Sequence, residues 1–388
     1  MIIGDLIREL RTGRGWSQGR LASELNAAFG TSLTREYVSG WERSRVRPGP
    51  FYLRCLAAVL EVPVAVLDGR PETAHGQGLL SGVAATSVAP AVAADLLDLG
   101  FAARLRGGPS EEEWEDLLAR YGEDYMAQGA AELQRRVVSD LVVVQQQLGS
   151  PRMWSVAARL MTFYATTFGA PDQDRAVTWF RTAVEAADRS GDRATRVWVR
   201  GRAALTLGYG RFAPGLAHLL AEQALAIDDT PSTGLLNALL GKAYAAAGRG
   251  DTGTALELAG RSRRVFDAAP SAGRVSDFAV ASWRLSGFLS LLSARLGDEK
   301  GALRAHEEAR RELPGTLPRF ATHLELHRGL MLVRAGDRAG GVAHARAALE
   351  ALPPSKYCGT LRMLMAEISE GAGAAAAEAT AGAGARAA

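Results

Sequence analysis

The first residues to suggest chemistry lie in one short segment, Trp16 to Pro48, which has two helix-sized amphipathic stretches separated by a turn. At the start of the second stretch, Arg35, Glu36 and Ser39 share one face of the expected helix. A cation, an anion and a hydroxyl on one face can hydrogen-bond to a polar partner. We interpret this stretch as a helix that reads DNA. The alternative is a solvated helix face that has no partner.

The surrounding sequence predicts short helices that position this face. An apolar stripe at helical spacing predicts a helix before residue 13, and Ser17 is a suitable N-cap for the next one. Thr34 is expected to cap the third helix, which runs to about Ser44. A fourth helix follows the prolines at positions 48 and 50, and Val62 to Leu67 supplies a short fifth element. Together these elements predict a compact five-helix, all-α domain over residues 1–70.

This segment resembles the Cro/C1-type (XRE) helix-turn-helix family from Ile3 to Leu67. The residues that carry the resemblance are Arg11, Trp16, Ser17, Gln18, Leu21, Ala22, Val38, Ser39, Trp41, Glu42, Arg43, Pro48, Leu56 and Ala57. From Leu21 to Val38 the chain is longer than the commonest family spacing. We therefore expect Asn26 to Thr31 to lengthen the second helix and the turn.

The resemblance implies which side chains contact DNA. Arg35, Glu36 and Ser39 would face base edges in the major groove, where Arg can pair with guanine and Glu can accept from cytosine. Gln18, at a helix N-terminus, would lie against a phosphate. The expected DNA-binding residues are Gln18, Thr34, Arg35, Glu36, Ser39, Arg43, Arg45 and Arg47, the last three forming a basic loop suited to phosphate contacts.

The same resemblance assigns supporting roles to residues that do not touch DNA. Arg11 and Glu42 match a family pair that forms a structural salt bridge, and Val38 and Trp41 are expected in the core. Gly40 lies where the family often has a larger contact residue, so we expect that contact to be missing.

Charge and composition set the class of protein. The chain has 388 residues and a formal net charge of +3, and residues 1–70 alone hold ten arginines against seven acidic residues. No apolar run reaches the roughly 18 residues that cross a membrane, and acids interrupt the apolar N-terminus, so we expect a cytoplasmic protein. The two cysteines, Cys55 and Cys358, are predicted to be buried free thiols.

Beyond the first domain, residues 71–109 predict a flexible linker with a short helix at Val92 to Arg106. Ser110 and Glu113 form a capping box for the next helix, and a longer helix is expected from Asp124 to Leu148. Residues 110–370 are predicted to be a helical repeat domain. Residues 371–388 are rich in Ala and Gly and predict a disordered tail.

The repeat domain is predicted from five similar segments. They end at Asp188, Asp228, Asp267, Pro314 and Pro354. Each follows a longer apolar helix and a turn, which resembles tetratricopeptide repeats with a longer interval. Such units stack into a right-handed solenoid whose first helices line the concave face. We expect these first helices at Met153–Phe168, Ala194–Tyr209, Thr233–Ala247, Ser276–Leu296 and Phe320–Ala335.

Aromatic, amide and cationic side chains on the first helices suit an extended peptide, although the aromatic ones also suit a core between repeats. The candidate ligand-binding residues are Trp198, Asn237, Tyr244, Trp283, Arg284, His323 and Arg328. His323 and His327 have a spacing that can ligate a metal, but no third ligand is evident, so neither a metal nor a cofactor is predicted.

The whole layout is similar to peptide-pheromone-responsive regulators of quorum sensing and to actinobacterial regulators of the same layout. This resemblance implies a transcription regulator that binds double-stranded DNA as a homodimer, with a helical domain that senses a peptide or small signal. Dimer contacts are expected from the Asp124–Leu148 helix or from the repeats. The alternative is a DNA-bound scaffold whose repeats recruit a protein partner. We find no nucleophile elbow, phosphate-binding glycine loop or CxxC motif, and we predict no enzyme.

Overall fold

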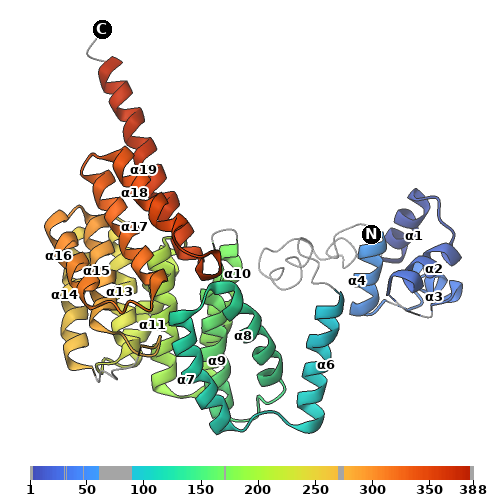
Figure 1. Ribbon diagram of the computed structural model, residues 1–388. Helices are drawn as coiled ribbons and strands as arrows, with labels where there is room; N and C mark the ends of the chain where they lie inside the picture. Colours follow the sequence, from blue (N-terminus) through green and yellow to red (C-terminus); the bar gives the residue numbers. More distant parts are fainter. Residues whose placement is uncertain are drawn as a thin grey trace. The chain divides into compact units, whose positions relative to one another are not determined.

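The computed structural model describes residues 3–29, 31, 33–46, 48–60, 90–169, 172–269 and 275–384. The chain forms two compact units, residues 1–86 and 87–388, and each is treated separately below. Every regular element within the described ranges is a helix (Figure 1), which confirms the predicted all-α class for these ranges. In the same ranges, no helix combines the length and apolarity needed to cross a membrane.

The first unit contains four described helices around one core. They are α1 (Ile3–Gly13), α2 (Gln18–Phe29), α3 (Arg35–Glu42) and α4 (Pro50–Val59). Ile7, Leu21, Val38 and Leu56 are completely buried where the four helices meet. The fifth element, expected at Val62–Leu67, lies outside the described residues.

The turn between α2 and α3 is organised by one side chain, Asn26. Its amide donates to the Leu33 carbonyl at 2.9 Å, and its Oδ1 accepts from the Leu33 backbone N–H at 2.7 Å. The Thr31 hydroxyl donates to the same oxygen at 2.7 Å. A short amide that satisfies local backbone groups stabilises a turn. The extra residues predicted between the two helices therefore form an ordered turn in front of α3.

The second unit begins at α6 and consists of helices joined by short turns (Figure 1). Its helices are α6 (Pro90–Arg106), α7 (Glu111–Ala127), α8 (Ala130–Gln145), α9 (Pro151–Thr166), α10 (Gln173–Ser190), α11 (Arg193–Gly210), α12 (Pro214–Ile227), α13 (Thr233–Gly248), α14 (Thr252–Ala268), α15 (Ser282–Leu296), α16 (Glu299–Glu312), α17 (Pro318–Arg334), α18 (Arg338–Glu350), the 3₁₀ turn η3 (Pro354–Lys356) and α19 (Gly359–Gly384).

Helix pairs form a repeat-like region from α9 to α18. The five segments found in the sequence correspond to α10, α12, α14, α16 and α18, and each packs on the helix before it. Small residues set the distance between neighbouring pairs. A Cβ added at Gly241 in α13 would lie 2.4 Å from the Ala204 carbonyl carbon in α11, so glycine allows these two backbones to touch.

Two expected helix boundaries are wrong. The break placed before Asp124 occurs at Gln128–Gly129, because α7 continues to Ala127. Gly129 is required there, since a Cβ on it would lie 2.0 Å from the Ser355 carbonyl oxygen. The helix expected from residue 276 begins at Ser282. At the C-terminal end, α19 runs to Gly384, within the segment predicted to be a tail, and alanine is the best helix former.

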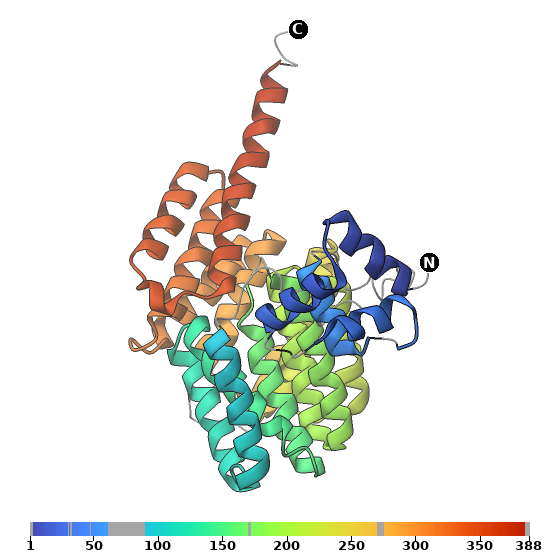
Figure 2. The same ribbon diagram turned by 90° about the vertical axis from the view of Figure 1, so that its right-hand side faces the viewer.

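The start of the second unit contacts its end. The Arg319 guanidinium of α17 donates to the Tyr125 carbonyl of α7. The Lys356 ammonium of η3 donates to the Ala127 carbonyl at 2.6 Å. Figure 2 shows the teal helices at the start of the unit beside the orange and red helices near its end. The first helix pair of the second unit, α7 and α8, therefore lies against α17 and η3 near its end, a long-range contact that the predicted solenoid did not include.

Candidate nucleic-acid interface and a buried pocket

Helix α3 has one buried face and one exposed face. Val38 and Trp41 are 0% and 2% exposed and pack in the core, as predicted. Arg35 and Glu36 are exposed, and Ser39 is half-buried beside them. The two faces follow from helical spacing, because residues three and four apart share a side. The polar residues singled out in the sequence therefore lie together on the outer side of the unit.

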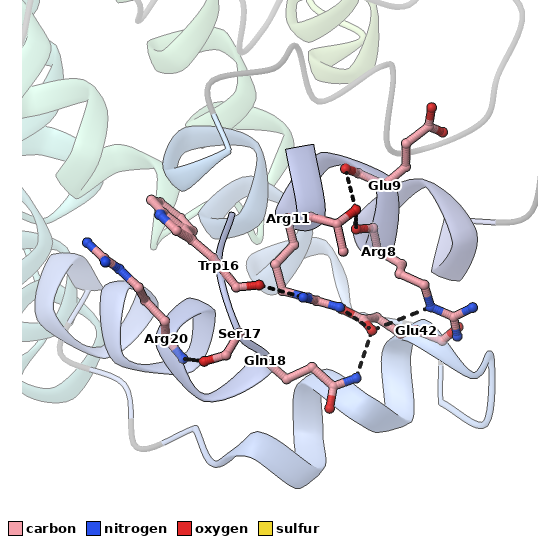
Figure 3. Close-up of polar contacts among 9 residues, drawn as sticks. Arg8, Glu9, Arg11, Trp16, Ser17, Gln18, Arg20 and Glu42 are labelled. Atoms are coloured by element: carbon pink, nitrogen blue, oxygen red, sulfur yellow. Dashed lines mark hydrogen bonds and ion pairs between the residues drawn. The ribbon is translucent and has the colours of Figure 1, made fainter. Parts of the chain in front are cut away.

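A buried carboxylate fixes α3 relative to α1 and α2. Arg11 Nε donates to Glu42 Oε1 at 2.6 Å, and a second guanidinium nitrogen donates to Glu42 Oε2 at 3.1 Å. Gln18 donates to the same Oε2 at 2.8 Å. Arg8 approaches this oxygen at 3.6 Å, as Figure 3 shows. The predicted salt bridge between Arg11 and Glu42 is confirmed, and three helices meet at one side chain.

Burial by itself would raise the pKa of Glu42. The hydrogen bonds from Arg11 and Gln18 and the positive charges of Arg11 and Arg8 outweigh burial and lower this pKa below its ordinary value of 4.5. The carboxylate therefore stays ionised at neutral pH. Arg11 also donates to the Trp16 carbonyl at 2.6 Å, so the same guanidinium fixes the turn that precedes α2.

Three of the expected DNA-binding residues, Gln18, Thr34 and Glu36, have local partners. The Gln18 amide is bonded to Glu42, and because an amide nitrogen has two N–H groups, one donor remains for a phosphate. Thr34 occupies the N-cap position of α3 but makes no side-chain cap bond. Its hydroxyl instead hydrogen-bonds to Glu36, which lowers the pKa of that exposed carboxylate. Ser17 does cap α2, accepting from the Arg20 N–H at 3.1 Å.

The basic residues after α3 are exposed on a tight turn. Arg43 and Arg45 are both exposed, and Ser44 between them has a φ of 55°. A left-handed residue reverses the chain direction quickly, which brings flanking side chains close to the helix end. Arg47, the third member of the predicted loop, lies outside the described residues.

Two further residues on this unit suit a nucleic acid and were not singled out. Tyr37 of α3 is 58% exposed, although it is a large aromatic residue. Arg20 lies at the start of α2, where its guanidinium stacks near the Trp16 ring with 5.6 Å to the ring centroid. The signal for Tyr37 was its position on α3, one residue after Glu36. The signal for Arg20 was its place near a helix N-terminus.

Two consecutive helices joined by a short turn, α2 and α3, with an exposed polar face on the second, form the arrangement of a helix-turn-helix domain. Residues 7–67 match the helix-turn-helix family model HTH_3, which is of the XRE type. The match supports a DNA-binding transcription regulator. No curated protein and no solved structure matches the chain significantly.

The second unit contains a partly open pocket of about 90 Å³ where its two ends meet. Its walls come from α11, α15 and α17, which are first helices of their pairs, together with α7, α8 and the start of α19. The aromatic wall residues are Tyr125, Tyr209, Trp283, Phe288 and Phe320. A cavity of this size suits a small molecule and not an extended peptide.

Of the seven candidate ligand-binding residues, only Trp283, Arg284 and His323 line this pocket. The other four are elsewhere. Trp198 packs on Phe278 with ring centroids 4.7 Å apart, as a core residue does. Asn237 is 2% exposed, and Arg328 is half-buried. The Tyr244 hydroxyl donates to the Phe288 carbonyl.

One carboxylate serves two buried arginines beside the pocket. Asp277 accepts from Arg202 Nε at 2.7 Å and from Arg284 at 2.5 Å, and it is 1% exposed. Burial would raise the pKa of Asp277, but the two positive charges outweigh it and lower this pKa. Among the described residues, Arg319 has only the backbone carbonyls of Tyr125 and Met126 as hydrogen-bond acceptors. The sequence does not indicate this cluster, because position 277 falls within an expected helix.

Histidine, tyrosine and cysteine side chains meet on another wall of the pocket. The Tyr209 hydroxyl is 3.3 Å from His323 Nδ1 and 3.1 Å from His327 Nε2. Cys358 Sγ is 3.7 Å from His323 Nε2. Burial is the main cause that lowers the pKa of His327 far below its ordinary value, so this ring is neutral. Within the described ranges, no group of three or more His, Cys, Asp or Glu residues could hold a metal ion.

Proposed function

We propose that the chain is a sequence-specific transcription regulator in which α3 enters the major groove. In this arrangement Arg35, Glu36 and Ser39 face base edges, while Arg43 and Arg45 contact phosphates. The observation that carries the proposal is the buried Arg11–Glu42 pair, because it fixes α3 with its polar face outward. A recognition helix needs this fixed orientation, since base readout depends on the register of a few side chains.

Enrichment of random DNA duplexes by the full-length chain tests this proposal. We expect a defined sequence motif for the wild-type chain and a loss of preference at one base pair for Arg35→Ala. Arg181→Ala is the matched control, because Arg181 is an exposed arginine on α10 in the other unit. Equal enrichment of all sequences by the wild-type chain would contradict the proposal.

The second unit is proposed to sense a small molecule that changes affinity for DNA. The concave pocket of α11, α15 and α17 supports a sensor over a scaffold, because it offers a small site between helices, whereas a scaffold would present an extended surface. A ligand shifts the balance between two arrangements of a protein only if it binds one of them better. The pocket lies where the two ends of the unit meet, so its shape depends on the contact between them. A ligand can therefore bind one arrangement of these ends better than another.

We also propose that the chain acts as a homodimer, which matches the two-fold symmetry of most helix-turn-helix operators. Helix α6 is the surface for the second copy. Its inner face packs on α8, but Leu97, Phe101 and Leu105 recur every four residues on its outer face and are 64%, 68% and 81% exposed. A stripe of exposed large apolar residues is characteristic of an interface.

Sedimentation of the full-length chain tests the dimer surface. Phe101→Glu is expected to convert a dimer into a monomer. Leu219→Glu, which changes an exposed leucine of α12, is expected to leave the dimer intact. A wild-type chain that sediments as a monomer at micromolar concentration would contradict the homodimer, and a Phe101→Glu dimer would contradict the role of α6.

A further inference from the structure

The pocket wall carries three positive guanidinium groups and one acidic thiol, that of Cys358, whose pKa is lowered to about 5. Arg202, Arg284 and Arg319 all contribute to its wall, and they are 4%, 6% and 4% exposed. None of the described residues that line the pocket is an aspartate or a glutamate. Asp277 lies behind the wall and pairs with two of the three guanidinium groups. The three guanidinium groups outnumber these two acidic groups, and burying an uncompensated charge is costly, so the excess positive charge of this wall favours an incoming anion.

Three N–H donors of lining residues have no acceptor within the described part of the chain. Arg284 Nε, Arg319 Nε and His327 Nδ1 are buried, and none of the described residues offers them a hydrogen-bond acceptor. The Tyr209 hydroxyl lies next to His327 Nε2. When Nε2 accepts a hydrogen bond from that hydroxyl, the neutral ring carries its proton on Nδ1. Buried donors in a folded protein are nearly always satisfied by protein or by ordered water, so these three are positions where a ligand can supply an acceptor.

A helix N-terminus adds to the positive character of the pocket. Gly359 and Thr360, the first residues of α19, are part of the wall. The first backbone N–H groups of a helix have no partner within the helix, and the helix dipole places partial positive charge there. Anions bind at such positions. This partial positive charge comes from the backbone, and it adds to the positive charge of the arginine side chains.

Another part of the wall is aromatic. The Tyr125 ring lies against all three guanidinium groups, with centroid distances of 5.1 Å to Arg202, 5.9 Å to Arg284 and 5.2 Å to Arg319. On the opposite helices, Trp283 and Phe320 pack edge to face with centroids 5.2 Å apart. Aromatic surfaces at this spacing suit a planar apolar group better than a hydrated inorganic ion.

We propose that the pocket binds a small organic anion, namely a carboxylate or a phosphate monoester carried on an aromatic or other flat apolar body. Arg284 and Arg319 hold the anionic group, and the aromatic residues around Trp283 hold the body. The proposal names the ligand class of the sensing pocket and thus rests on the proposed function for its regulatory meaning. Binding itself is measured without DNA, so a failure to bind DNA leaves the proposal standing.

Calorimetric titration of the full-length chain with four matched probes is the test. Phenylacetate and phenyl phosphate carry the anion, phenylacetamide is neutral, and phenethylamine is a cation. We expect at least one of the two anions to bind ten-fold or more tightly than the neutral and cationic probes. The tighter anion identifies the head group. Equal binding of the neutral probe, or no binding of either anion at millimolar concentration, would overturn the proposal.

A variant pair assigns the contact to the arginines. Arg319→Gln is expected to weaken binding of the preferred anion ten-fold or more. Arg181→Gln removes the same charge from the exposed surface of α10 and is expected to change nothing. If circular dichroism shows a folded Arg319→Gln chain that retains the wild-type anion preference, Arg319 does not hold the anion. If that variant does not fold, the comparison of probes on the wild-type chain decides alone.

Discussion

Arg11 Nε lies 2.6 Å from Glu42 Oε1 although the two residues are 31 positions apart. This bond joins the first helix of the chain to the last residue of the proposed recognition helix. Gln18 at the start of α2 completes the contact at 2.8 Å. The orientation of α3 therefore depends on one buried carboxylate, and the proposed DNA contacts depend on that orientation.

Glu42→Gln is expected to destabilise the DNA-binding unit by about 3 kcal/mol, because it leaves the buried Arg11 charge without its counter-charge. Hydrogen exchange of the α1 to α3 amides measures this loss within the full-length chain. Glu9→Gln is the matched control, since Glu9 is exposed on α1. Equal protection of the α1–α3 amides in Glu42→Gln and in the wild-type chain would show that the ion pair does not hold these helices.

The Glu42 carboxylate also makes the stability of the DNA-binding unit depend on pH in the acidic range. The pKa of Glu42 is lowered in the folded chain, so its contribution to stability is complete above its ordinary value of 4.5 and is lost as pH falls through the lowered pKa. We expect amide protection in α1 to α3 to decline in this acidic range for the wild-type chain. The decline is expected to be smaller in Glu42→Gln. An identical pH profile for both chains would contradict this role.

Close contact between α11 and α13 predicts a sharp difference between two glycines of one helix. Gly241→Ala places a Cβ 2.4 Å from the Ala204 carbonyl carbon and 2.6 Å from the Leu205 nitrogen, both backbone atoms. We expect a loss of about 2 kcal/mol in stability of the second unit, because overpacking forces backbones apart. Gly248→Ala, which meets no atom within 4 Å, is expected to cost nothing. Chemical denaturation followed by circular dichroism compares the two variants.

Cys358 is expected to react as a thiolate at neutral pH. Burial raises the pKa of its thiol, but the hydrogen bond and charge of His323, with the charge of Arg319, outweigh burial and lower the pKa to about 5. Alkylation by iodoacetamide, followed by mass spectrometry, is expected to reach its full rate by about pH 6, whereas an ordinary thiol titrates near 8.5. Cys55, which is 2% exposed, is the internal control and is expected to remain unmodified.

The His323→Gln variant tests whether the imidazole, and not the exposure of the thiol alone, makes Cys358 reactive at neutral pH. Without the imidazole, the pH at which Cys358 alkylation is half its maximum is expected to move upward. An alkylation rate that keeps rising to pH 9 in the wild-type chain would contradict a lowered pKa. An unchanged profile in His323→Gln would show that the imidazole is not the cause.

Local patterns in the sequence predicted most of the fold. Capping residues and apolar spacing located the first four helices, and the repeated segments located five helices of the second unit. These features depend on neighbours within a few positions, which a sequence displays directly. The Arg11–Glu42 pair was predicted as well, because the family resemblance supplied a contact that local pattern does not contain.

The pocket could not be predicted, because contacts distant in sequence create it. Arg319 meets Tyr125 across 194 positions, and Arg202 meets Asp277 across 75. Asp277 falls in an apolar stretch that reads as a helix, yet its carboxylate is held outside α15 by two arginines. Sequence reasoning identified cationic and aromatic residues on the first helices. Only folding decides which of these reach the pocket, as Trp283 does, and which enter the core, as Trp198 does.

The central claim is that α3 reads bases, and a cycle of substitutions in protein and operator tests it most directly. Affinity of the wild-type and Arg35→Ala chains is measured for the selected operator and for operators changed at each base pair. We predict that one base-pair change costs the wild-type chain about 1–3 kcal/mol and costs Arg35→Ala almost nothing. If Arg35→Ala distinguishes every position as the wild-type chain does, α3 does not read bases through Arg35.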